Sequence, residues 1–286
     1  MNPNNARKSD EKESQIHSHS AGFFFGLLIM LYPFISNSLN RMKTENLVSK
    51  YNGDVDKTSQ RKLTEAYRKA RAYNRNHTAN TIVDIFNHNS PVRDEYMSLL
   101  NLSGNGMMGY IEIPEIHQRL AIYHGTDDEV LQKGCGHIAG TSLPVGGKST
   151  HSVLAAHRGL PSAKLFTDLD RLKEGDEFYV FVLNRTLAYK VDQIKTVKPD
   201  NLDDLQIVKG KDYVTLFTCT PYAVNTHRLL VRGHRIPYVP KGNATRTVMD
   251  SFESYWIVIF VVGIIALAVV IWIKRKERKK MQKELR

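Results

Sequence analysis

The segment TLFTCTPYAVNTHRLLVRGHR, residues 215–235, contains two apolar runs separated by a turn. The first run ends around Cys219, and Pro221 follows it closely. Proline cannot donate a hydrogen bond to a β-ladder, so a strand is predicted to end at this point. The second run starts near Arg228 and predicts the next strand. A cysteine at the end of a strand is well placed to face a cleft from a rigid support.

Further β-rich runs lie between Gly109 and this segment. They include the alternating runs GYIEIPEI and RLAIYHG, the mostly apolar run HSVLAAH, and a predicted hairpin that turns near Asn184 and Arg185. Short helical pieces, such as DEVLQKG and SAKLFTDLDRL, separate some of them. About eight short strands with Gly and Pro turns are typical of a closed or nearly closed β-barrel. The predicted fold class is therefore mainly β, with the barrel at residues 109–240.

The region before the barrel, residues 36–108, is predicted to be a helical extension. The stretches TENLVSKYN and SQRKLTEAYRKARAYNRN have helical spacing and few strong apolar residues. We expect these helices to pack on the outside of the barrel.

Two apolar segments near the ends of the chain predict membrane attachment. Residues 255–273 carry no charge and have aromatic residues at both borders, which predicts a transmembrane helix. Residues 21–35 are short for a span, and we interpret them as an uncleaved signal anchor, with a cleaved signal as the alternative. The basic tail at 274–286 is expected in the cytoplasm by the positive-inside rule. The polar residues 1–20 are then also cytoplasmic, and residues 241–254 form a linker to the second anchor.

The net charge of +11 is concentrated at the C-terminus. Residues 274–286 contain eight Lys or Arg and two Glu, so they contribute +6 and leave +5 for the remaining 273 residues. Nucleic-acid binding would require basic clusters in the folded region. The charge therefore favours contact with membrane lipid and argues against a nucleic-acid partner.

The chain has two cysteines, Cys135 and Cys219, too few for a disulfide framework, although a single disulfide between them stays open. Cys135, within KGCGHIAG, lies where an apolar residue would serve, so we interpret it as structural. Cys219 is either a small buried residue, as most free cysteines are, or a reactive thiol.

A reactive thiol needs a base or a cation close to it. His157 is the best placed of eight candidate histidines, because it ends the buried run SVLAA and precedes Arg158 and Gly159. Arg228 would meet Cys219 if it begins the neighbouring strand, and a fixed cation there could stabilise an oxyanion. Arg232 and Arg235 are expected to be solvated residues on the barrel face. No metal-binding or cofactor-binding pattern is present in the sequence.

Two segments resemble the sortase family. TLFTCTPYAVNTHRLLVRGHR is similar to the sortase active-site signature, and HSVLAAHRGLPSAKLFTDLDRL (residues 151–172) is similar to the segment that carries the sortase histidine. The resemblance covers roughly residues 40–273. The C-terminal span and the long helical extension point to class C, the pilus-polymerising sortases of Gram-positive bacteria.

The resemblance implies an eight-stranded sortase barrel whose catalytic residues are His157, Cys219 and Arg228. It implies cleavage of an LPXTG-type sorting signal through a Cys thioester, followed by transfer to a Lys amine of a pilin subunit. Class C members often carry a lid with an Asp-Pro-aromatic motif. The matching residues here are Asp84 and Phe86, although Ile85 replaces the proline and puts the rigidity of the lid in doubt.

Other functions stay open from the sequence. One is a sortase that anchors proteins to the cell wall, and another is a cysteine protease that uses water as the acceptor. A third, from a different class, is a surface scaffold with two membrane anchors and no catalytic activity. That scaffold would explain the anchors and the basic tail, but it does not require a cysteine after a β-strand with an arginine nine residues later.

Overall fold

The computed structural model describes residues 3–76, 93–240, 263–265, 268, 271–272 and 275. The chain divides into two units, residues 1–238 and 239–286. The predicted lid residues Asp84 and Phe86, the linker and most of the predicted C-terminal span lie outside the described residues. Among the residues that are described, no helix is both long enough and apolar enough to cross a membrane.

Three helices precede the strands in the first unit. They are α1 (Pro3–Lys57), α2 (Gln60–Asn76) and α3 (Arg93–Ser98). Val48, Tyr51 and Val55 in α1 are buried, because their spacing of three and four residues gathers them on one face of the helix. Tyr51 Oη donates to the Met108 carbonyl (2.9 Å) and accepts from the Leu183 amide (2.7 Å), so α1 is fixed to the barrel.

Helix α2 also packs through one face. Leu63, Ala70, Tyr73 and Asn74 are buried, whereas the charged residues of this helix are mainly exposed. The Asn74 side chain pairs with both backbone groups of Leu143, at 3.0 Å and 2.7 Å. The predicted helices before the barrel are therefore present, and they pack against it.

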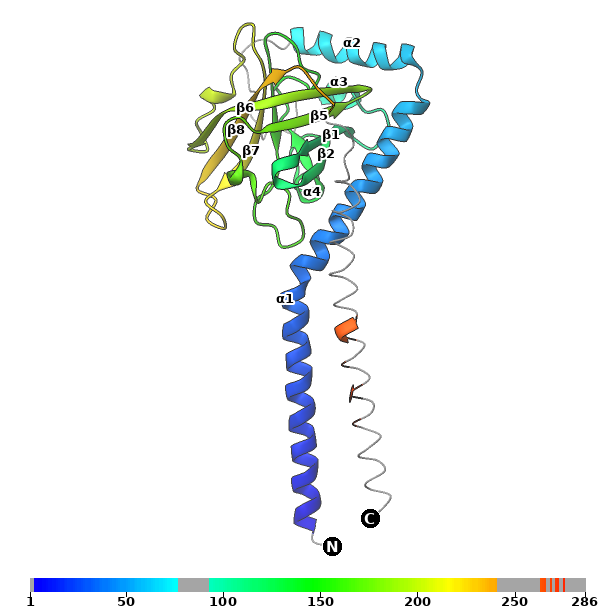
Figure 1. The fold of residues 1–286 in the computed structure, drawn as a ribbon, viewed down its shortest axis with the longest axis vertical. Helices are drawn as coiled ribbons and strands as arrows, with labels where there is room; N and C mark the ends of the chain where they lie inside the picture. Colours follow the sequence, from blue (N-terminus) through cyan, green and yellow to red (C-terminus); the bar gives the residue numbers. More distant parts are fainter. Residues whose placement is uncertain are drawn as a thin grey trace. The chain divides into compact units, whose positions relative to one another are not determined.

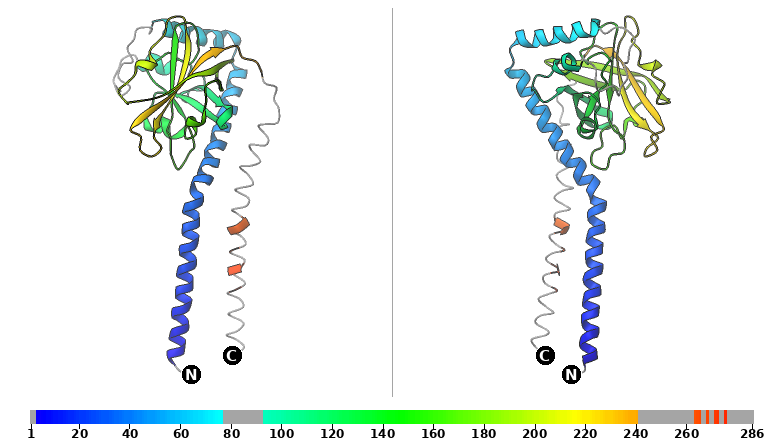
Figure 2. Two further views of the ribbon diagram at one scale, coloured as in Figure 1. Left: turned by 60° about the vertical axis from the view of Figure 1, so that its left-hand side comes forward. Right: turned by 180° about the vertical axis from the view of Figure 1, so that it is seen from behind.

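Eight strands form a closed barrel in the order β1-β2-β3-β4-β7-β8-β6-β5 (Figures 1 and 2). This arrangement confirms the prediction of a mainly β, eight-stranded barrel. The strands are β1 (Met107–Ile113), β2 (Gln118–His124), β3 (Cys135–His137), β4 (Thr150–Ala155), β5 (Glu177–Val182), β6 (Arg185–Val197), β7 (Asp212–Thr220) and β8 (His227–Ile236).

Short helical turns connect some of the strands. They are α4 (Asp128–Lys133), η1 (Pro114–Ile116), η2 (Leu169–Arg171) and η3 (Asp203–Leu205). The helical interpretation of residues 162–172 was largely wrong, since only η2 is helical there. Phe166 and Leu169 in this stretch are fully buried, and Leu165 has a positive φ of 40°, which a regular helix does not allow.

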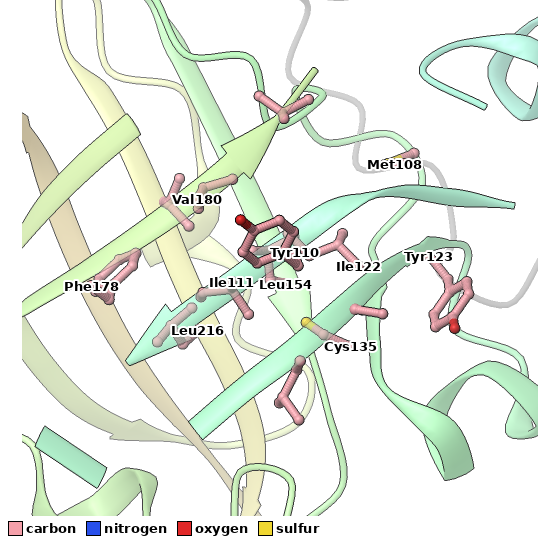
Figure 3. Close-up of a cluster of buried hydrophobic side chains, with 14 of the residues drawn as sticks. Met108, Tyr110, Ile111, Ile122, Tyr123, Cys135, Leu154, Phe178, Val180 and Leu216 are labelled. Atoms are coloured by element: carbon pink, nitrogen blue, oxygen red, sulfur yellow. The ribbon is translucent and has the colours of Figure 1, made fainter. Parts of the chain in front are cut away.

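The barrel encloses an apolar core (Figure 3). Ile111, Ile122, Leu154 and Leu216 come from four different strands and are fully buried. Two strand pairs, β2–β3 and β4–β7, are parallel, and the other pairs are antiparallel. The β4–β7 pair matters most for the site, because it brings together segments that are far apart in the sequence.

Candidate active site

Cys219 lies at the C-terminal end of β7. The strand ends one residue later, at Thr220, and Pro221 follows, as the sequence predicts. Residues Tyr213 to Leu216 of β7 are buried, whereas Cys219 is half-buried. The strand thus anchors the backbone at Cys219 to the core, while the residue itself keeps part of its surface exposed.

Arg228 is the direct partner of Cys219 across the antiparallel pair β7–β8. Side chains of directly opposed residues point to the same face of the sheet, with Cβ atoms about 4.5–5.5 Å apart. One guanidinium nitrogen of Arg228, Nη1, donates to the carbonyls of Asn225 (3.0 Å) and His227 (3.1 Å). These bonds tie the arginine to the turn that precedes β8.

His157 reaches the same place from the other side of β7. The parallel pair β4–β7 aligns Ala155 with Phe217. One residue further, the Ala156 amide donates to the Phe217 carbonyl (3.2 Å), so the pairing continues past the end of β4. The same register places His157 level with Cys219, and neighbouring strands lie about 4.8 Å apart. His157, like Arg228, is half-buried.

The three predicted site residues therefore lie at one level on three neighbouring segments, in the order His157, Cys219, Arg228. The register thus places Cys219 between His157 on one neighbouring segment and Arg228 on the other. A base beside the thiol can take its proton, and a fixed cation can stabilise negative charge on a substrate oxygen. Such an arrangement suits acyl transfer through a thioester.

Sequence reasoning assigned no role to several polar groups around these residues. Arg158 Nη1 donates to Thr220 Oγ1 (3.0 Å), and its Nη2 donates to Asp170 in η2. The Thr218 hydroxyl donates to the Ala156 carbonyl (2.8 Å). The only sequence signal for Arg158 was its place directly after His157.

Three of the other candidate histidines are structural. Burial lowers the pKa of His137 and of His151 to about 4, and it also lowers the pKa of His124. His137 Nε2 donates to the Ser142 carbonyl (2.9 Å), and its Nδ1 accepts from the Tyr96 hydroxyl (2.9 Å). Such groups stay neutral inside the protein and are far less suited to proton exchange with a substrate.

Cys135 is fully buried in the core (Figure 3). Burial raises the pKa of its thiol far above the usual range, so this sulfur is a poor source of thiolate. The structural interpretation of Cys135 agrees with this position. Both cysteines are free, so the structure contains no disulfide between them.

Two arginines differ from the expectation. Arg232 is not simply solvated, because its Nε donates to Asp192 (2.9 Å) and its guanidinium stacks over Tyr213, 4.3 Å from the ring centroid. Arg235 lies over the Tyr189 ring at 5.5 Å. Aromatic faces attract guanidinium groups, which explains these positions. Within the described part of the chain, no cluster of three or more His, Cys, Asp or Glu could hold a metal ion.

The sortase domain family matches residues 111–236 of the chain. Sortase C1 from Streptococcus agalactiae is a solved structure with 51% identity and a TM-score of 0.65, and the match covers 68% of this chain and 100% of that one. Sortase C-1 from Actinomyces oris has 47% identity and a TM-score of 0.59, with coverage of 62% and 99%.

Curated relatives are more distant. Sortase A of Staphylococcus aureus is 34% identical over 122 residues, which cover 41% of this chain and 57% of that protein. Three others, sortase A of Streptococcus agalactiae, sortase A of Bacillus anthracis and sortase D of Bacillus subtilis, are matched over 60%, 61% and 63% of their lengths. The chain thus spans less than two thirds of these relatives. The barrel, the matched domain and the full coverage of a solved sortase C1 establish that this chain belongs to the sortase family and groups with its class C members.

Proposed function

We propose that this protein is a membrane-anchored cysteine transpeptidase that joins pilin subunits. The proposal rests on the register of the barrel, which pairs Cys219 with Arg228 and, extended two residues past β4, aligns His157 with Cys219. A scaffold without catalytic activity would not require a half-buried thiol between a base and a cation.

The first half-reaction cleaves the sorting signal. The Cys219 thiolate attacks the Thr carbonyl carbon of an LPXTG-type signal, and a C–S bond forms. The bond between that carbon and the Gly nitrogen then breaks, and His157 protonates the leaving amine. Arg228 stabilises the oxyanion of the tetrahedral intermediate, in which the negative charge lies on the former carbonyl oxygen. The product on the enzyme is a thioester.

The second half-reaction transfers the acyl group to an amine. A Lys side chain of another pilin subunit attacks the thioester carbon, and His157 accepts the proton that the amine loses. The C–S bond breaks and Cys219 is released. An isopeptide bond joins the two subunits, so each cycle adds one subunit to the polymer.

The choice of pilin as substrate comes from the class C relatives. The structural study of Streptococcus pneumoniae sortase C, which is 45% identical to this chain, concerns pilin substrate specificity in that protein. The proposal extends a pilin substrate to this chain. It also includes the two membrane anchors with an extracellular barrel, and a lid formed by Asp84 and Phe86.

The test is a Cys219→Ala variant expressed in the native host from which the chromosomal copy has been removed. The proposal expects loss of high-molecular-weight pilin ladders, while the variant stays in the membrane fraction. Cys135→Ala is the matched control, because it removes the other thiol and should leave the ladders intact. Polymerisation by the Cys219→Ala variant at the wild-type level would refute the proposal.

A second assay separates the acceptors. The full-length protein in detergent is incubated with purified pilin, with a cell-wall precursor amine, or with peptide in buffer alone. Pilin multimers support the proposal, coupling to the precursor supports a cell-wall-anchoring sortase, and hydrolysis that an added amine does not change supports a protease.

A further inference from the structure

Two side-chain hydrogen bonds bracket the pair formed by His157 and Cys219. Thr218 donates to the Ala156 carbonyl, and Arg158 donates to the Thr220 hydroxyl. Each bond joins residues 62 positions apart in the sequence. This is also the separation of Ala155 and Phe217 in the β4–β7 ladder. The side chains therefore continue the strand register after the backbone pairing has ended.

Backbone hydrogen bonds alone do not extend the β4–β7 pairing as far as Thr220. The ladder ends at Ala155, and the Ala156 amide makes one more contact. Gly159 then turns the chain away with a positive φ of 82°. At this point Arg158 provides the link between the two segments, one residue beyond the reactive pair.

The other end of Arg158 is also held. Its Nη2 bonds Asp170 in η2, and this helix is fixed because the neighbouring Leu169 is fully buried. The His157 carbonyl accepts from the Phe166 amide (3.1 Å), so the loop that carries the imidazole folds back onto the same core. Arg158 thus connects the end of β7 to η2 across the base of this loop.

The position of Arg158 is costly. Only 9% of its side-chain surface is exposed, and its Nε atom is buried without a hydrogen-bond partner among the described residues. A buried charge must be desolvated, and replacing a whole buried ion pair by apolar residues of similar volume is often neutral or stabilising. A role in stability alone therefore does not explain why an arginine is found here.

We propose that Arg158 is a positioning residue that holds His157 level with the Cys219 thiol by bridging Thr220 and Asp170. The inference rests on the proposed cysteine chemistry. Proton transfer requires the imidazole within hydrogen-bond reach of the reacting atoms. A displacement of about 1 Å can lower a rate by about a hundredfold. Arg158 acts through the backbone of His157 and the end of β7, and needs no contact with substrate.

The test compares variants of the full-length protein in detergent. Arg158→Met removes both bonds and keeps an apolar side chain of similar length, and Thr220→Val removes only the accepting hydroxyl. Arg171→Met is the matched control, because Arg171 lies in the same η2 turn with 70% of its side chain exposed. Three properties are measured for each variant: the kcat and KM of peptide cleavage, the rate of Cys219 labelling by a small methanethiosulfonate across pH, and the thermal midpoint of unfolding. A Cys219→Ala sample supplies the labelling blank.

The inference expects kcat to fall by about tenfold to a hundredfold in Arg158→Met, with KM changed less than threefold. The rate of Cys219 labelling near neutral pH should fall in this variant, because the thiol loses the aligned imidazole. Thr220→Val should change kcat and the labelling rate in the same direction, and Arg158→Lys should restore part of kcat. Arg171→Met should match the wild type.

A purely structural role predicts another result. The thermal midpoint would fall, while the labelling profile and the kcat of the folded fraction would stay unchanged in both Arg158→Met and Thr220→Val. That outcome overturns the inference, and Thr220→Val decides the question if Arg158→Met does not fold. If the wild type cleaves no peptide but its labelling profile depends on Arg158 and Thr220, the proposed function fails and the positioning role stands.

Discussion

The buried histidines predict that the barrel loses stability under mildly acidic conditions. His151 is a clear example, because its Nδ1 donates to the Gln206 carbonyl (3.0 Å) and its Nε2 accepts from the Thr215 hydroxyl (2.7 Å). Both ring nitrogens are hydrogen-bonded in the neutral form, and the side chain is almost fully buried. Protonation would place a positive charge in this buried site, and burial disfavours the charged form.

The direction of the pH effect on stability follows from the pKa of each histidine in the folded and in the unfolded protein. Burial lowers the pKa of His151 and of His137 from 6.5 to about 4 in the folded protein. Between pH 6.5 and 4 the unfolded chain binds protons that the folded chain does not, so the free energy of unfolding falls as the pH falls. Each pH unit in this window contributes about 1.4 kcal/mol per histidine. At pH 5 the loss is therefore about 2 kcal/mol for each of the two residues, and about 4 kcal/mol together.

The measurement is urea unfolding at pH 7, 6 and 5, followed by near-UV circular dichroism of the buried tyrosines. His151→Gln should reduce the loss between pH 7 and pH 5 by about 2 kcal/mol relative to the wild type, because glutamine does not titrate. His117→Asn is the control, because His117 is exposed and its φ of 52° suits asparagine. Equal losses in the wild type and in His151→Gln would refute the assignment of a neutral buried imidazole.

Three further predictions concern other parts of the first unit. Arg228→Lys should lower the kcat of peptide cleavage by about a hundredfold, because a point charge replaces an oriented guanidinium. Steady-state kinetics would measure the change, and circular dichroism should show little change in folding. An unchanged kcat would contradict an oxyanion role. Tyr51→Phe should lower the free energy of unfolding by about 2–3 kcal/mol and the Tm by about 5–10 °C, because the Met108 carbonyl and the Leu183 amide lose a buried partner. Calorimetry or urea titration measures the change. A loss below about 1 kcal/mol would be inconsistent with these bonds. Cys135→Ala should keep full activity and lower the free energy of unfolding by about 1 kcal/mol in the same urea titration. Loss of activity in the folded variant would mean that the core thiol is needed.

The local features of the site were predictable from the sequence. The strand before Cys219 ends where Pro221 requires it, and Arg228 falls opposite Cys219 because a short turn joins two adjacent antiparallel strands. Cys135 is buried in the core, as its apolar setting indicated. These features depend on residues that lie close together in the sequence or within one hairpin.

Long-range features were not predictable from residue patterns alone. The choice of His157 over the other histidines depends on the parallel pairing of β4 with β7, and periodicity does not reveal which strands become neighbours. The position of His157 after a buried run favoured it, and the resemblance to a family supported that choice. Arg158 was noticed only as a neighbour of His157, because its partners Thr220 and Asp170 come from different parts of the chain.

The stretch 162–172 shows how helical spacing misleads. Lys164 and Asp168 are four residues apart and form an ion pair, as in a helix. The backbone nevertheless follows another path, because Phe166 and Leu169 each enter the core separately. Tertiary burial outweighed local propensity here.

The parallel pairing of β4 with β7 also bears on when the candidate site is assembled during folding. Parallel strands require a crossover, and here the hairpin of β5 and β6 lies between them in the sequence (Figure 1). A nascent chain that has emerged only as far as β6 contains the imidazole but not the thiol. Contacts between distant segments form slowly, so the two reactive groups meet late in folding. A sequence change that slows closure of that hairpin would therefore delay the meeting of His157 and Cys219 and leave the folded site unchanged.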